Sequence, residues 1–230
     1  MTGCSNAMSR ALLTTTAVLA LASACTPFSN VRSAQIHPGP SMALQASVST
    51  LPGEVAGWFW SVDCESMCNS PVFGTNAGFA YGWPTTSGER GFEVGGGLNG
   101  VYPYIDGYVQ LSGGRVPFGL GAQAGLPVTS WREHQLYARF DIPLGDGRRL
   151  LLNPAGFLHE GESPNGENPG TFKGFVQGIG LLLEGQRVSW TPAVTVVAGR
   201  AERTSYGQRF GPESSVLVVG SLGVTFHRRR

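Results

Sequence analysis

Two short runs of the chain combine residue types that hydrolytic enzymes use. They are His159, Glu160 and Ser163 in one run, and Arg132, Glu133 and His134 in the other. General acid–base catalysis requires such groups within hydrogen-bonding reach of one another, and adjacency in sequence does not establish this. Residues 160–170 are rich in Glu, Gly, Pro and Asn, which is typical of a solvated loop. We therefore expect no catalysis, and a hydrolase acting near these residues is the alternative.

Cys64 and Cys68 are separated by three residues. In an exported chain the first expectation for such a pair is a disulfide that closes a small loop. A metal site would need more ligands, and no histidine lies close to these cysteines in the sequence. Free or metal-bound thiols are the alternatives, and we expect neither a metal nor another cofactor.

Four charged residues stand in stretches that otherwise alternate between apolar and small side chains. They are Glu93, Asp106, Arg139 and Asp141. Each lies on the face opposite the large apolar side chains, so in a closed barrel all four would point into the lumen. They could form a salt-bridged plug that stabilises the interior, or a gate or selectivity ring for a small pore. We favour the plug, because about ten strands enclose only a modest lumen.

From residue 41 onward, strand-like runs alternate with clusters of Gly, Pro, Asn and Asp. The predicted strands are 43–60, 73–83, 91–99, 102–112, 115–126, 134–143, 149–159, 171–184, 187–199 and 214–226. Leu51–Glu54 interrupts the first run and is either a bulge or a turn that would give eleven strands. Ten strands agree better with alternating short and long connections, including a long loop over 200–213.

The predicted strands carry large apolar side chains on one face and Gly, Ser or Asn on the other. In 76–83, for example, Phe79, Tyr81 and Trp83 alternate with small residues. A lipid-facing Arg or Lys at mid-bilayer would cost about 2–4 kcal/mol. Gln177 is an exception, since it shares the apolar face of its strand. Aromatic residues are predicted at both rims: Trp58, Trp60, Phe73, Tyr102, Tyr104, Trp131 and Phe157 at one, and Trp83, Phe92, Phe118, Trp190 and Phe226 at the other.

The composition is unusual for a soluble protein. Charged residues make up 13% of the chain, against roughly 25% in ordinary globular domains. The formal net charge of +1 gives no electrostatic argument for binding nucleic acid. A water-exposed barrel exterior would have to be built from very few charges.

The start of the chain has the pattern of a secretory signal. Residues 8–25 contain one positive charge, an apolar run and then small residues, which suggests that translation starts at Met8. The end of this stretch, Ala22–Cys25, resembles the lipobox of bacterial lipoproteins, and that resemblance implies acylation of Cys25. A plain signal peptide cut nearby is the alternative. We expect residues 26–40 to be a flexible tether and 41–230 to be the barrel domain.

Residues 41–226 resemble the small outer-membrane β-barrel proteins of Gram-negative bacteria. The last strand carries the resemblance through Gly220, Leu222, Val224 and the terminal aromatic Phe226, although His227–Arg230 follow it. The resemblance implies an all-β, antiparallel, up-and-down transmembrane barrel in the outer membrane. Its partner would be membrane lipid, with an anchor at Cys25 and both termini in the periplasm.

We therefore expect an outer-membrane barrel lipoprotein with a structural, adhesive or narrow-channel role. Two alternatives are a hydrolase at the outer rim and a lipid-tethered, soluble, lipocalin-like carrier. The carrier would have its apolar residues inside and a charged exterior. The sequence does not determine the oligomeric state.

Overall fold

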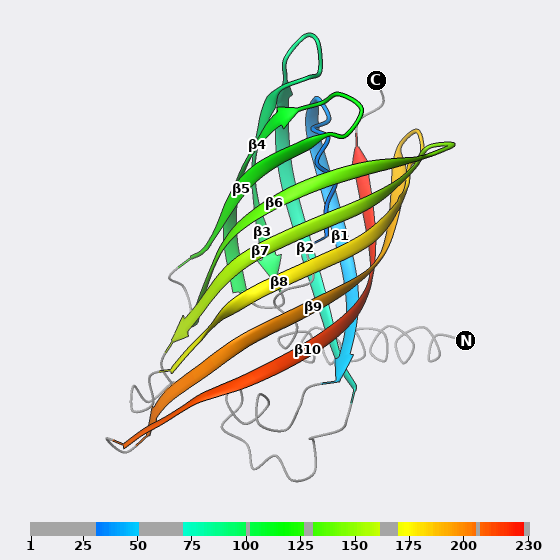
Figure 1. The fold of residues 1–230 in the computed structure, drawn as a ribbon. Helices are drawn as coiled ribbons and strands as arrows, with labels where there is room; N and C mark the ends of the chain where they lie inside the picture. Colours follow the sequence, from blue (N-terminus) through cyan, green and yellow to red (C-terminus); the bar gives the residue numbers. More distant parts are fainter. Residues whose placement is uncertain are drawn as a thin grey trace, which may run out of the picture.

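The computed structural model describes residues 31–50, 71–99, 102–126, 131–161, 170–205 and 208–227. In these residues ten antiparallel strands close into one barrel (Figure 1). The strands are β1 (Gly39–Thr50), β2 (Pro71–Pro84), β3 (Gly91–Asn99), β4 (Tyr102–Ser112), β5 (Phe118–Gly125), β6 (Trp131–Gly145), β7 (Arg148–Gly161), β8 (Gly170–Leu183), β9 (Val188–Ser205) and β10 (Gln208–His227). Each strand pairs with its sequence neighbour and β1 pairs with β10. The predicted all-β, up-and-down barrel of about ten strands is confirmed.

The first strand was predicted to reach residue 60; β1 is described as far as Thr50, and residues 51–70 lie outside the described residues. The largest difference from the predicted strands lies between β9 and β10. The long loop predicted over 200–213 is wrong, because β9 continues to Ser205 and β10 begins at Gln208. Polar residues there suggested a loop, yet backbone pairing continues through them, with one irregularity between Phe210 and Glu213.

One end of the barrel, at the top of Figure 1, carries four turns together with the start of β1 and the end of β10. We call it the turn end and the opposite end the loop end. The β6–β7 turn is the tightest of the four. There Gly145, Asp146 and Gly147 all have positive φ, at 91°, 52° and 70°, as short hairpins that match the strand twist require.

The outer face of the barrel is apolar. Among the described residues, twenty-eight large hydrophobic side chains are exposed, and Leu136 is the most exposed of them at 72%. Gln177, the predicted exception, does point outward, and its Nε2 donates a hydrogen bond to the Gly178 carbonyl at 2.9 Å. No helix in the described part of the chain is long and apolar enough to span a bilayer.

Aromatic side chains surround the turn end on the outer face. They are Trp83, Phe92, Phe118, Trp190 and Phe226, all exposed as the sequence predicted. Trp83 and Phe92 stack with ring centroids 4.5 Å apart. At the loop end the prediction was wrong for Tyr104 and Phe157, which are buried. Both share the inward parity of their strands.

Residues 31–38, which we call the lumen segment, lie inside the barrel. Val31, Ala34 and Ile36 are buried, and the segment leads into β1 at the turn end (Figure 1). Val31 lies beside Gly178 and Gly180 of β8, deeper in the barrel than Ile36, which lies beside Gly82 and Gly91. These residues are packed against the barrel wall, so the flexible tether predicted for 26–40 does not describe residues 31–38. Residues 26–30 lie outside the described residues.

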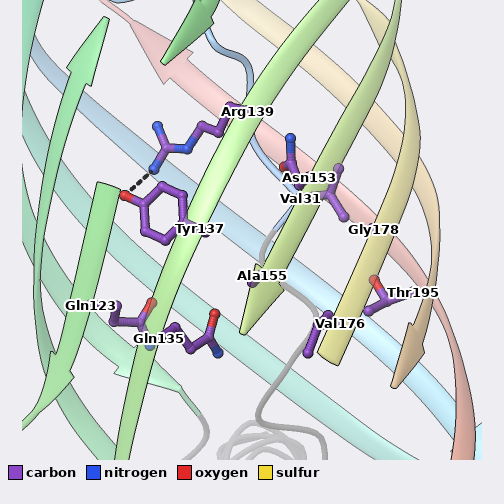
Figure 2. Close-up of a pocket in the computed structure, with 10 residues that line it drawn as sticks. All are labelled: Val31, Gln123, Gln135, Tyr137, Arg139, Asn153, Ala155, Val176, Gly178 and Thr195. Carbon is purple, nitrogen blue, oxygen red and sulfur yellow. Dashed lines mark hydrogen bonds between the residues drawn. The ribbon is translucent and has the colours of Figure 1, made fainter. Parts of the chain in front are cut away.

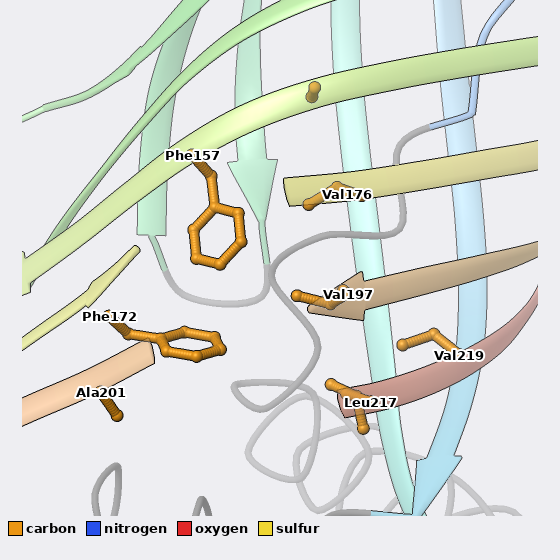
Figure 3. Close-up of a cluster of buried hydrophobic side chains, with 8 residues drawn as sticks. Phe157, Phe172, Val176, Val197, Ala201, Leu217 and Val219 are labelled. Carbon is orange, nitrogen blue, oxygen red and sulfur yellow. The ribbon is translucent and has the colours of Figure 1, made fainter. Parts of the chain in front are cut away.

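The lumen wall towards the loop end is apolar on β7–β10. A buried cluster there comprises Ala155, Phe157, Phe172, Val176, Val197, Ala201, Leu217 and Val219. Figure 3 shows Phe157 and Phe172 facing each other, with Val176, Val197, Leu217 and Val219 beside them. The sequence suggested a lumen face of small residues, and this part of the wall is more apolar than expected. Polar side chains line other parts of the wall, including Gln45, Ser47, Asn76, Asp106 and Gln123.

Candidate functional site in the barrel lumen

Two arginines and two acids form a compact group of charges in the lumen. Arg139 on β6 lies 3.2 Å from Glu93 on β3 and 3.3 Å from Asp106 on β4. Arg32 of the lumen segment approaches the same two carboxylate oxygens at 3.6 and 3.5 Å. We call these four residues the charge group. Its formal charges cancel, as burial of ionised side chains requires.

The Arg139 guanidinium also contacts the faces of two tyrosine rings. Its Cζ lies 4.2 Å from the Tyr108 ring centroid and 4.8 Å from that of Tyr137, and the two rings are nearly parallel. Arg139 donates to the Tyr137 hydroxyl at 2.9 Å, and that hydroxyl in turn donates to Asp106. Cation–π contacts and charged hydrogen bonds strengthen in a desolvated site. The arrangement therefore holds Arg139 in one position across the lumen.

Alternate backbone N–H groups of the lumen segment donate to side chains of the wall. Arg32 N donates to Asn153 Oδ1 at 2.7 Å, Ala34 N to Asp141 Oδ1 at 2.7 Å, and Ile36 N to Gln110 Oε1 at 2.8 Å. The Tyr108 hydroxyl donates a hydrogen bond to the Ala34 carbonyl oxygen at 2.8 Å. Side chains of β4, β6 and β7 thus satisfy backbone groups that a neighbouring strand would otherwise satisfy.

Asp141, the fourth charge expected in the lumen, is fully buried but lies outside the charge group. Its Oδ2 accepts a hydrogen bond from Ser33 Oγ at 2.5 Å, and Arg149 lies 3.9 Å away. Arg149 also approaches Glu184 at 3.6 Å, near the turn end. Asp141 therefore holds the lumen segment, whereas Glu93, Asp106 and Arg139 gather around Arg32.

The wall carries glycines where the lumen segment passes. A Cβ at Gly82 would lie 2.3 Å from the His37 carbonyl oxygen, and one at Gly178 would lie 2.7 Å from a Val31 methyl carbon. The cavities beside the segment are about 30 Å³ and about 40 Å³, room for one or two water molecules each. Figure 2 shows the first, with Val31, Asn153 and Gly178 on one side and Tyr137 and Arg139 on the other.

Comparisons with known proteins give a structural likeness only. No family model and no curated protein matches the chain. Among solved structures the chain is similar to the crystal structure of the outer membrane protein OprG from Pseudomonas aeruginosa. The identity is 10%, the match covers 86% of this chain and all of that one, and the TM-score is 0.32.

Strand alternation divides the described residues of the two runs that suggested hydrolysis between the two faces of the barrel wall. His159 and Glu133 point into the lumen, where both are buried and lie directly opposite each other in the β6–β7 register. Glu160 and Arg132 lie on the opposite face of the same strands, because successive strand residues alternate. Glu133 accepts hydrogen bonds from Gln135 and from Asn99, and the Tyr102 ring lies edge-on to His159. Ser163 lies outside the described residues.

The remaining predicted site residues, Cys25, Cys64 and Cys68, also lie outside the described residues. Within the described residues, no group of three or more His, Cys, Asp and Glu side chains is placed to share a metal ion. Sequence reasoning missed Arg32, because it stood in the supposed tether. It also missed Tyr108 and Tyr137, although both share the inward parity of Asp106 and Arg139 in their strands.

Proposed function

We propose that the protein is an integral outer-membrane barrel that acts as a narrow channel, closed at rest by its own lumen segment, without catalysis. The observation that carries the proposal is the position of residues 31–38 inside the barrel, bonded to β4, β6 and β7. In this account the turn end faces the periplasm, since outer-membrane barrels have short periplasmic turns.

The outer face supports insertion into a membrane. A continuous apolar exterior on a closed barrel would be costly in water and is what lipid requires. The aromatic side chains at the turn end would lie at the membrane interface. The inverted faces expected of a soluble, lipocalin-like carrier are absent from the described strands, because their large apolar residues cover the exterior.

The charge group sets the selectivity expected of an opened lumen. Glu93 and Asp106 are neutralised by Arg139 of the wall and by Arg32 of the lumen segment. Displacing the segment removes Arg32 and leaves one excess negative charge in the charge group. Rings of acidic side chains favour cations in narrow pores. The opened barrel should therefore pass small cations better than anions.

The test is conductance of the purified full chain in planar lipid bilayers. Gly82→Val places a side chain against the His37 carbonyl and Ile36, and so should displace the lumen segment without changing a charge. We expect the wild type to be almost silent and the Gly82→Val variant to conduct, with a preference for potassium over chloride.

Gly107→Val is the matched control, because Gly107 faces outward and a Cβ there meets nothing within 4 Å. It should be as silent as the wild type. Two results would contradict the channel proposal: open-pore conductance in the wild type, or silence in a folded Gly82→Val variant whose lumen segment is accessible to protease. The second would leave a purely structural or adhesive role.

Two parts of the proposal concern residues outside the described ones. We propose acylation of Cys25, which metabolic labelling with a radioactive fatty acid should detect in the wild type and miss in Cys25→Ser. We also propose a Cys64–Cys68 disulfide, which should protect both thiols from alkylation until a reductant is added. Labelling of Cys25→Ser, or alkylation of both loop thiols without reductant, would refute the respective proposal.

A further inference from the structure

A pair of cations stands on the outer face of the barrel, towards its loop end. Lys173 on β8 and Arg200 on β9 are directly opposite each other in the antiparallel register. Both are exposed and share the outward parity of Phe175 and Ala198. Like charges in opposite positions destabilise a sheet unless something lies between them.

In the described part of the chain, neither cation forms an ion pair. The nearest described acids on this face are Glu160 and Glu202. They stand one row closer to the loop end, one on each side of Thr171. The row of the cations continues to Leu158 and Ser214, which are uncharged. The two cations therefore form a small positive patch.

The patch borders a groove with an apolar floor. The groove has a volume of about 420 Å³ and is lined by Lys173, Gly174, Phe175, Ala198, Gly199, Arg200, Ser214, Ser215 and Val216. Gly174 and Gly199 lie opposite each other and contribute only backbone to the groove, because their side-chain positions face the lumen. The groove thus presents two cations at one side and the apolar side chains of Phe175, Ala198 and Val216 nearby.

The depth of the patch matches a membrane interface. Lys173 lies ten residues from Leu183 on β8, and Arg200 lies ten residues from Trp190 on β9. Ten strand residues span about 33 Å, which a tilt of about 40° reduces to about 25 Å, the height of the apolar band of an outer-membrane barrel. With Trp190 at one interface, the cations lie at the other.

We propose that Lys173 and Arg200 bind the phosphate of a lipid in the outer leaflet, with an acyl chain of that lipid lying along Phe175, Ala198 and Val216. A phosphate accepts hydrogen bonds from both cations and removes their repulsion. This proposal rests on the proposed insertion into the outer membrane and on the assignment of the loop end to the outside. It does not depend on the channel.

Native mass spectrometry of the full chain in detergent tests the site, with diphosphorylated lipid A as the probe and phosphatidylethanolamine and inorganic phosphate as comparisons. We expect a lipid A adduct on the wild type. The Lys173→Gln/Arg200→Gln variant should bind lipid A at least about tenfold more weakly, because two charge-assisted contacts are lost. Arg132→Gln is the control, because Arg132 points outward at the same end but stands opposite Glu160. It should bind like the wild type.

Equal lipid A binding by the wild type and the double variant would overturn the site. So would displacement of lipid A by millimolar inorganic phosphate, which would indicate a free-phosphate site instead. The SDS gel mobility of each sample, with and without boiling, distinguishes a failure of the lipid site from a failure of the embedded barrel. A heat-dependent shift without lipid A preference refutes only the lipid site, whereas no shift in the wild type refutes the embedded barrel on which it rests.

Discussion

At the scale of single residues, the interior is organised around Arg139. It contacts Glu93, Asp106 and the rings of Tyr108 and Tyr137, and only 4% of its surface is exposed. A buried ion pair need not stabilise a protein more than apolar residues of the same size would. Removing one partner of such a pair is nevertheless costly, because it leaves the other charge buried and uncompensated. The loss of Arg139 should therefore cost more than the loss of any exposed arginine.

We predict that Arg139→Ala lowers the free energy of unfolding by about 3–5 kcal/mol. Arg139→Lys should give a smaller loss, because lysine keeps the charge but cannot reproduce the planar contacts with two carboxylates and two rings. Urea unfolding in lipid vesicles, followed by tryptophan fluorescence, measures both. Arg148→Ala, at an exposed position of the turn end, should change stability by less than about 0.5 kcal/mol. If Arg139→Ala and Arg148→Ala changed the free energy of unfolding equally, the stabilising role given to Arg139 in the interior would be refuted.

At the scale of strands, the period-two alternation of the sequence was sufficient to predict the direction of most side chains. The choice of ten strands over eleven also used the connection lengths, although the long connection predicted over 200–213 was wrong. The alternation placed Glu93, Asp106, Arg139 and Asp141 on the lumen face, because each alternates with apolar neighbours. It could not predict the lumen segment, whose acceptors Asn153, Asp141 and Gln110 lie 74 to 121 residues away in the chain. Residues 31–38 have no alternation of their own, and composition alone suggested a linker.

The outward face of β6 offers a test of membrane insertion. We predict that Leu136→Arg, at the most exposed apolar position, destabilises the barrel in lipid vesicles by about 2–4 kcal/mol. Leu144→Arg lies on the same face close to the turn end, so its cost should be about 0–1 kcal/mol. On a water-exposed strand both changes would be nearly neutral. A neutral Leu136→Arg would therefore contradict membrane insertion.

At the scale of the molecule, the barrel encloses a piece of its own chain. The lumen segment supplies Arg32 to the charge group, places Val31 beside Gly178 and Gly180, and meets β1 at the turn end. The wall and the lumen segment depend on each other. Arg32 of the segment neutralises the negative charge that Arg139 leaves over, and side chains of the wall accept hydrogen bonds from the backbone of the segment. Closure of the lumen by residues 31–38 is the central claim of this account.

The most direct test of this claim is a disulfide between the lumen segment and the wall. A Cβ at Gly180 would lie 3.0 Å from Val31 Cγ1, which is close to where the sulfur of a cysteine at position 31 would stand, so cysteines at the two positions are within reach of a disulfide. In the full chain without its native cysteines, Val31→Cys/Gly180→Cys should cross-link in the cell envelope, as non-reducing peptide mapping would show. The control pair Val31→Cys/Gly156→Cys should not, because Gly156 faces outward. Absence of the first cross-link in a heat-shifting barrel, or equal cross-linking of both pairs, would contradict closure of the lumen by this segment.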